Sequence, residues 1–299
     1  MTGLDLLVIG DAMVDVTVKP SQGRRGGAYP SAILVSPGGL GNVAVAAAFS
    51  GARVGFVGKV GNDVLGQMYE SDLRSNGILS FVRRCHLSTG ICINFVHPGG
   101  ERTMYTSRGA NELLASKDVP DRLFQQTRMV FASGFSMETA NSATQIERIC
   151  RRAKELGREV AVGGGAFNLI ARRRERFCRL ARDVADILIL NEQEALTLTG
   201  KNAVAPALTA LGGIVKFLVV TMGERGSALY RDGSSAHIPL SSPRRKAVDT
   251  TGAGDVFAGT LLAGLLAGED PTESIRLAHL RAGQSVTHLG PRPPKVPQS

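Results

Sequence analysis

Between residues 129 and 221, four short apolar runs alternate with helical segments, and this alternation restricts the fold more than any other feature of the chain. The runs are MVFAS (129–133), EVAVG (159–163), DILILN (186–191) and KFLVVT (216–221). Strands that alternate with helices form right-handed βαβ units, which build a parallel sheet covered by helices. The sequence therefore predicts an α/β protein with three layers, in which a mostly parallel sheet carries helices on both faces.

The N-terminal half contains strand-like runs of a second kind. The segment from Leu4 to Gly10 is a short, mostly apolar run and reads as another buried strand of the core. Other runs alternate between apolar and polar residues, as half-exposed strands do, namely VDVTVKP (14–20), SAILVS (31–36), SFVRR (80–84), GICINFV (90–96) and RTMYTS (102–107). We expect one domain over residues 1–299, with a small antiparallel sheet inserted at about 12–36 and 85–108 as a lid.

Composition excludes several classes of function. The formal charge is +9, but the basic clusters at 151–154, 172–176 and 244–246 are scattered and have no interleaved aromatic residues, so no nucleic-acid partner is expected. The four cysteines form no CxxC pair, which favours unlinked thiols in a reducing compartment. No signal peptide or membrane-length apolar run is found, and the expected location is the cytoplasm, without a membrane partner.

The stretch VDTTGAGDVFAG (248–259) predicts a site for an anion. Gly252, Ala253 and Gly254 carry almost no side chain and precede an apolar, helix-like run. Bare backbone N–H groups at the positive end of a helix attract anions. A carboxylate there repels an anion unless it handles a proton beside it, and this task is predicted for Asp255. The alternative is that Asp255 only caps the helix.

Neither of two common nucleotide-binding motifs explains this sequence. The chain has no G-x-x-x-x-G-K-[ST] motif, which excludes a P-loop protein. Residues 39–44, GLGNVA, satisfy the G-x-G-x-x-A dinucleotide fingerprint, but Pro37 precedes them where a strand should lead in. The alternative is that Gly38 and Gly39 let the backbone approach a ligand to which Asn42 offers its amide.

Taken together, these motifs resemble the ribokinase-like (PfkB) carbohydrate kinase family. The resemblance rests on GG-x-GN at 38–42 and DTTGAGD at 249–255, with further matches at 10–15, 191–194 (NEQE) and 221–226 (TMGERG). It covers nearly the whole chain. It implies a nine-stranded α/β core with a β-sheet lid, and an ATP-dependent kinase that uses Mg²⁺.

The resemblance also implies roles for individual residues. The amides of Gly252, Ala253 and Gly254 form an anion hole for the γ-phosphoryl group, and Asp255 is the general base. Asn191 and Glu194 order Mg²⁺ and its waters, while Asp249 and Thr251 help to hold a potassium ion. For these two pairs the alternatives stay open: a polar helix start for the first, and an Asx or Ser/Thr turn for the second.

Substrate and nucleotide ligands are expected on opposite sides of this centre. Arg108 is a candidate for binding an acidic group of the substrate, because it lies where the lid chain re-enters the core. The expected substrate ligands are Asp11, Asp15, Gly39, Asn42 and Arg108, although Asp11 could be a simple turn residue. The expected nucleotide ligands are Asn191, Thr221, Gly223, Gly226, Gly254 and His279.

One segment departs from the family pattern. After the run EVAV, family members often continue with Asp or Asn and Pro, whereas this chain has Gly163, Gly164 and Gly165. The glycines predict an altered backbone beside the phosphate site.

The expected activity is transfer of a phosphoryl group from ATP to a primary hydroxyl of a sugar or sugar acid. A nucleoside kinase is the first alternative, supported by Phe95 and Tyr105 in the lid. A sugar-binding regulator without turnover is the second. By analogy with the family, we also expect a homodimer in which the lids pair.

Overall fold

The structure of this 299-residue protein is a computed structural model, which describes residues 3–19, 32–96, 102–240 and 247–292. The predicted basic cluster at 244–246 therefore lies outside the described residues.

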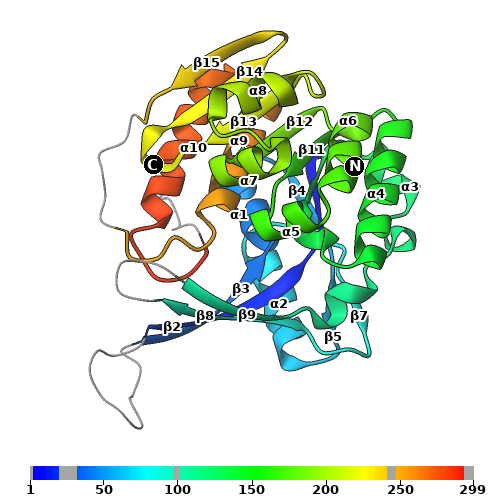
Figure 1. The fold of residues 1–299 in the computed structure, drawn as a ribbon. Coiled ribbons are helices and arrows are strands. Elements are labelled where there is room, and N and C mark those ends of the chain that lie inside the picture. Colours follow the sequence, from blue (N-terminus) through cyan, green and yellow to red (C-terminus); the bar gives the residue numbers. More distant parts are fainter. Residues whose placement is uncertain (1–2, 20–31, 97–101, 241–246, 293–299) are drawn as a thin grey trace.

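A nine-stranded sheet forms the centre of the molecule, in the order β15-β14-β13-β12-β11-β10-β1-β4-β6 (Figure 1). Seven strands from β13 to β6 pair in parallel, and the β14–β15 hairpin continues the sheet in the antiparallel direction. The strands are β1 (Leu4–Ile9), β4 (Val54–Val57), β6 (Leu79–Ser80), β10 (Thr127–Ser133), β11 (Glu159–Gly163), β12 (Ile187–Asn191), β13 (Phe217–Thr221), β14 (Ser227–Arg231) and β15 (Ser234–Ile238). The predicted three-layer α/β fold is confirmed.

Two layers of helices cover the sheet, and its central strands are mostly apolar because both of their faces are buried. In β1, Leu7 and Ile9 pack into one hydrophobic cluster, while Leu6 and Val8 pack into the other. The first cluster includes side chains of α3 (Asp121–Gln125), α4 (Ala140–Glu155), α5 (Phe167–Arg172), α6 (Arg174–Val184), α7 (Glu192–Thr199) and α8 (Val204–Gly212). The second includes side chains of α1 (Gly41–Phe49), α2 (Val64–Ser75), α9 (Ala253–Ala267) and α10 (Pro271–Ser285).

A separate four-stranded sheet lies below one end of the core, in the order β3-β2-β8-β9 (Figure 1). Its strands are β2 (Ala12–Lys19), β3 (Ala32–Gly39), β8 (Gly90–Val96) and β9 (Arg102–Ser107). The expectation of an antiparallel sheet is wrong in one pairing, because β2 and β8 run parallel. These strands belong to two separate insertions, so no hairpin turn forces them to be antiparallel.

Two apolar or strand-like runs of the sequence are each divided between two strands. The segment 53–61 breaks into β4 and β5 (Lys59–Gly61) at Gly58, where an added Cβ would lie 2.9 Å from the Gly10 carbonyl oxygen. The run 80–84 contributes to β6 of the core and to β7 (Arg83–Cys85), which pairs with β5. The four-stranded sheet therefore resumes at Gly90 rather than at residue 85.

All four cysteines are free, as predicted, and one of them, Cys150, is buried. Within the described residues, no helix is both long enough and apolar enough to cross a membrane.

Candidate active site

The predicted site residues gather at the carboxyl edge of the parallel sheet. Asp11 follows β1, Asn191 ends β12 and Thr221 ends β13. Helix α9 begins close to this edge, and the Asn42 amide of α1 donates a hydrogen bond of 3.1 Å to an Asp255 carboxylate oxygen. Ligand sites of open α/β sheets lie at this edge. The fold thus joins the early GG-x-GN motif to the late GAGD motif, more than 200 residues apart.

The loop before α9 has the geometry of an anion site. Gly252 is the N-cap residue, with φ of +75°, and an added Cβ would lie 2.4 Å from the Pro291 carbonyl oxygen. An added Cβ on Gly254 would meet nothing within 4 Å, so open space lies above this turn. Asp255 is the third residue of α9, which has no side-chain cap. The helix-cap alternative for Asp255 is therefore wrong.

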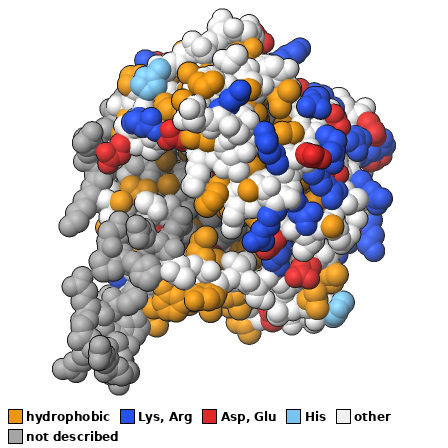
Figure 2. Space-filling view, in the orientation of Figure 1, with side chains coloured by type: hydrophobic (Ala, Val, Ile, Leu, Met, Phe, Trp, Pro, Cys, Tyr) orange, Lys and Arg blue, Asp and Glu red, His pale blue; other side chains and the backbone are white. Residues whose placement is uncertain are grey.

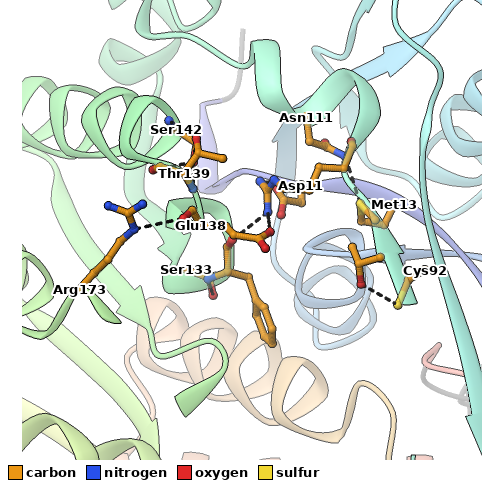
Figure 3. Close-up of polar contacts among 12 residues, drawn as sticks. Asp11, Met13, Cys92, Asn111, Ser133, Glu138, Thr139, Ser142 and Arg173 are labelled. Atoms are coloured by element: carbon orange, nitrogen blue, oxygen red, sulfur yellow. Dashed lines mark hydrogen bonds and ion pairs between the residues drawn. The ribbon is translucent and has the colours of Figure 1, made fainter. Parts of the chain in front are cut away.

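Arg108 lies inside the protein and pairs with two carboxylates, those of Asp11 and Glu138, which are labelled in Figure 3. Its guanidinium contacts Asp11 at 2.7 Å, Glu138 at 3.2 Å and the carbonyl oxygen of Phe135 at 3.0 Å. The side chains of Arg108 and Asp11 are each 8% exposed, whereas that of Glu138 is 41% exposed. Burial raises the pKa of Asp11, and the positive charge of Arg108 opposes this rise. Both terminal nitrogens of Arg108 thus already have partners within the chain.

Glu194 is buried, with 4% of its surface exposed, at the first turn of α7. Its carboxylate accepts hydrogen bonds from the N–H groups of Asn191 (2.8 Å) and Gly165 (3.2 Å). The Asn191 side chain in turn caps the N–H of Glu194 at 2.9 Å, so the polar helix start that was the alternative for this pair is observed. Burial raises the pKa of Glu194 to about 7, the backbone hydrogen bonds oppose this rise, and the charge of Asp255 adds to it.

This pKa predicts how Glu194 affects stability. Because the folded-state pKa of about 7 exceeds the ordinary glutamate pKa of 4.5, the folded protein holds a proton that the unfolded chain releases. Stability is therefore lost as the pH rises from about 4.5 to about 7. We expect the variant Glu194→Gln to gain melting temperature relative to the wild type at pH 8, and to gain less at pH 5. An equal difference at both pH values, measured by calorimetry, would contradict this pKa.

Asp249 and Thr251 form a turn before the anion loop. One oxygen of the Asp249 carboxylate accepts hydrogen bonds from the N–H and hydroxyl of Thr251, and the other accepts the N–H of Gly290 at 3.0 Å. The Asx-turn alternative is thus what the structure shows. Asp249 is fully buried, and these bonds tie the anion loop to the segment that follows α10.

Of the expected nucleotide ligands, Asn191, Thr221, Gly223 and Gly226 lie at or after the ends of β12 and β13, whereas Gly254 lies on α9 and His279 on α10. Thr221 pairs with Asn191 across the two strands, and its hydroxyl lies 3.5 Å from the carbonyl oxygen of Leu190. Gly223 and Gly226 have φ values of +58° and +83°, and an added Cβ on Gly223 would meet nothing within 4 Å. His279 is buried, 2.8 Å from the Ser227 hydroxyl, and burial lowers its pKa to about 4. His279 is thus a neutral packing residue near pH 7.

Polar side chains line the face of the four-stranded sheet that carries Asp15. The strand register places Asp15 beside Ser36 and Cys92, and Thr17 beside Asn94. Within the described residues, the hydroxyls of Thr17 and Ser36 and the amide nitrogen of Asn94 are buried without a hydrogen-bond partner. Such groups are costly unless a ligand or water satisfies them. Sequence reasoning missed all three, although their alternation with apolar residues could have identified them.

The opposite face of this sheet is largely apolar and carries Phe95 and Tyr105. Phe95 is in register with Val18, and Tyr105 with Ile93, so neither shares a face with Asp15. Their rings contact each other edge to face, 6.2 Å apart. An aromatic residue that the sequence did not single out, Phe135, is 41% exposed where its carbonyl meets Arg108.

No group of three or more His, Cys, Asp or Glu side chains that could hold a metal ion occurs in the part of the chain that the structure describes. A Mg²⁺ ion that is held by one or two carboxylates, waters and phosphates needs no such group. Glu194, a buried carboxylate under the electrostatic influence of Asp255, fits that mode of binding.

Comparison with known proteins agrees with this geometry. Residues 4–298 match the sequence profile described as pfkB family carbohydrate kinase. The chain is 31% identical to the cytidine kinase of Thermococcus kodakarensis, over 96% of this chain and 98% of that protein. It is 29% identical to fructokinase-1 of Zea mays, over 97% and 94%. The crystal structure of adenosine kinase from Sinorhizobium meliloti superimposes with a TM-score of 0.89 at 30% identity, covering 97% of this chain and 96% of that one. The fold, the two glycine motifs and this match over nearly the whole length together show that the chain belongs to the pfkB family of carbohydrate kinases.

Proposed function

We propose that this protein transfers the γ-phosphoryl group of ATP to a primary hydroxyl of a sugar or sugar acid. The observation that carries the proposal is the position of Asp255. Asp255 directly follows the open Gly-Ala-Gly turn at the N-terminus of a buried helix. The amide of Asn42, from the early GG-x-GN motif, donates a hydrogen bond to its carboxylate.

Phosphoryl transfer depends mainly on positioning and on the stabilisation of charge. The N–H groups of Gly252, Ala253 and Gly254 bind the oxygens of the γ-phosphoryl group. Asp255 accepts the proton of the acceptor hydroxyl while the new P–O bond forms, and ADP leaves with the electrons of the bond that breaks. Thr221, Gly223, Gly226 and His279 lie along the ATP side of the site.

Asn191 and Glu194 are the residues that would hold Mg²⁺, through one carboxylate and intervening waters. When bound, the ion neutralises charge on the phosphates. For Asp249 and Thr251 we propose a supporting role beside a potassium ion. A comparison of turnover in potassium and sodium salts tests this role, and equal rates would contradict it.

The polar face of the four-stranded sheet favours a sugar as the acceptor. Asp15, together with Thr17, Ser36 and Asn94, offers small hydrogen-bonding groups, and none of these is aromatic. Asp11, Gly39 and Asn42 complete the substrate side, and Arg108 orients Asp11 through their ion pair. We propose that this sheet acts as a lid, which excludes water when a sugar binds.

A nucleoside kinase remains the second candidate, now for a different reason. The lid aromatics face away from Asp15, but the exposed ring of Phe135 belongs to the residue whose carbonyl contacts Arg108. A nucleoside base could stack on such a ring. The relatives include kinases named for cytidine and adenosine as well as fructose.

A screen for ADP release, with ATP, Mg²⁺ and potassium, tests the proposal against a panel of sugars, sugar acids and nucleosides. Turnover on a sugar or sugar acid supports the proposal, and turnover only on nucleosides supports the second candidate. If no compound is phosphorylated while one still raises the melting temperature, the protein is a sugar-binding regulator. The intact Asp255 and anion loop argue against that outcome.

The apolar face of the lid predicts a homodimer. Its exposed side chains include Ile33 (60%), Val35 (48%) and Tyr105 (63%), and hydrophobic atoms gather over this region in Figure 2. We propose that two lids pair through this face. Light scattering should give a dimer for the wild type and a monomer for Val35→Lys. The control Val64→Lys changes an exposed valine on α2, outside the lid, and should remain dimeric. A monomeric wild type would contradict the proposal.

A further inference from the structure

The glycine run that departs from the family pattern lies directly against Glu194. An added Cβ on Gly164 would lie 2.1 Å from Oε2 of Glu194 and 2.5 Å from its carboxyl carbon. The next residue, Gly165, donates its N–H to Oε1 of the same carboxylate at 3.2 Å. The backbone after β11 thus approaches a buried carboxylate as closely as only a residue without a side chain allows.

The constraint at Gly164 comes from this contact and not from its own backbone angles. Its φ is negative, whereas Gly165 has φ of +130°. An alanine at 164 is therefore not opposed by a left-handed φ, and the nearest atoms that its Cβ would meet all belong to the Glu194 carboxylate.

The segment is also confined from the opposite side. An added Cβ on Gly134 would lie 2.0 Å from the carbonyl oxygen of Gly164, and one on Gly165 would lie 2.7 Å from the N–H nitrogen of Phe135. The N–H of Gly164 donates to the Ile189 carbonyl of β12 at 2.9 Å. The backbone at 164–165 cannot retreat from Glu194 without moving these neighbours, so a side chain at 164 would displace the carboxylate instead.

We propose that Gly164 is a positioning residue for magnesium, whose missing side chain lets the Gly165 amide and the Asn191 amide fix the Glu194 carboxylate from two sides. The inference rests on the proposed function, in which Glu194 orders Mg²⁺ near the phosphates. Loss of a group that orients a metal ligand typically lowers metal affinity by about 10–100-fold.

The test measures the melting temperature of the full chain with ADP as Mg²⁺ is titrated, so that turnover is not required. For Gly164→Ala, we expect the Mg²⁺ concentration that gives half of the melting shift to rise by about 10-fold or more. The control Gly213→Ala should match the wild type, because the nearest atom to an added Cβ there is 3.5 Å away. A wild-type Mg²⁺ requirement in Gly164→Ala would overturn the inference.

Combining Gly164→Ala with Glu194→Ala shows whether Gly164 acts by positioning the Glu194 carboxylate or by supporting the fold in general. In Glu194→Ala there is no carboxylate to displace, so Gly164→Ala should not raise the Mg²⁺ requirement further. If the two substitutions raise it independently, Gly164 acts through the fold and the inference is wrong. If Mg²⁺ does not shift the melting temperature even of the wild type with ADP, the proposed magnesium site is wrong. The inference about Gly164 is then wrong as well.

Discussion

Asp255→Asn should lower kcat by about 10²–10⁴-fold, the usual contribution of a general base. Asparagine keeps the size of the side chain and can still accept a hydrogen bond from the Asn42 amide, but it cannot take the proton of the acceptor hydroxyl. Binding of the acceptor, followed as a melting shift or by calorimetric titration, should change much less than kcat.

A matched control is Asp270→Asn, which alters an acid at the start of α10. Asp270 accepts the N–H groups of Thr272 and Glu273 as a helix cap, and asparagine caps a helix about as well, so this change should leave both stability and kcat near the wild-type values. If Asp255→Asn keeps more than a tenth of the wild-type kcat, Asp255 is not the general base.

Arg108→Met should lower the free energy of unfolding by about 3–5 kcal/mol, the usual cost of removing one partner of a buried ion pair. The reason is that Asp11 would be left buried beside Glu138 without its counter-charge. Denaturant unfolding measures this loss.

Two further variants show whether the Asp11 pair is the cause. Asp11→Asn combined with Arg108→Met removes both buried charges, and its cost should be clearly smaller than the sum of the two single costs. Glu138→Gln removes the more exposed partner and should cost less than about 1 kcal/mol. A cost of less than about 1 kcal/mol for Arg108→Met would show that the pair is hydrated in solution.

Part of the candidate site could be predicted from short sequence motifs. Gly252–Asp255 form an open turn at a helix N-terminus, because small residues followed by an apolar run specify that geometry locally. The role of Arg108 could not be predicted in this way. Its partner Asp11 lies 97 residues earlier, and a sequence does not reveal that a charged side chain is already paired.

The role of the Gly163–Gly165 run could not be predicted from the sequence either. Sequence comparison marks it as a departure, but its contact with Glu194 depends on how the turn after β11 lies against the start of α7. The sequence also did not reveal which face of the four-stranded sheet carries Phe95 and Tyr105. A one-residue change of register moves a side chain to the other face of a sheet.

The sequence by itself determined the α/β core, because strands buried on both faces must be apolar throughout and helices must separate strands that run parallel. It also determined the anion loop, whose chemistry lies within a few consecutive residues. Only the tertiary structure decided the parallel β2–β8 pair, the polar face of the four-stranded sheet around Asp15, the Arg108 ion pairs and the close approach of Gly164 to Glu194. Each of these depends on contacts between segments that are distant in the chain, and such contacts are set by packing rather than by local preference.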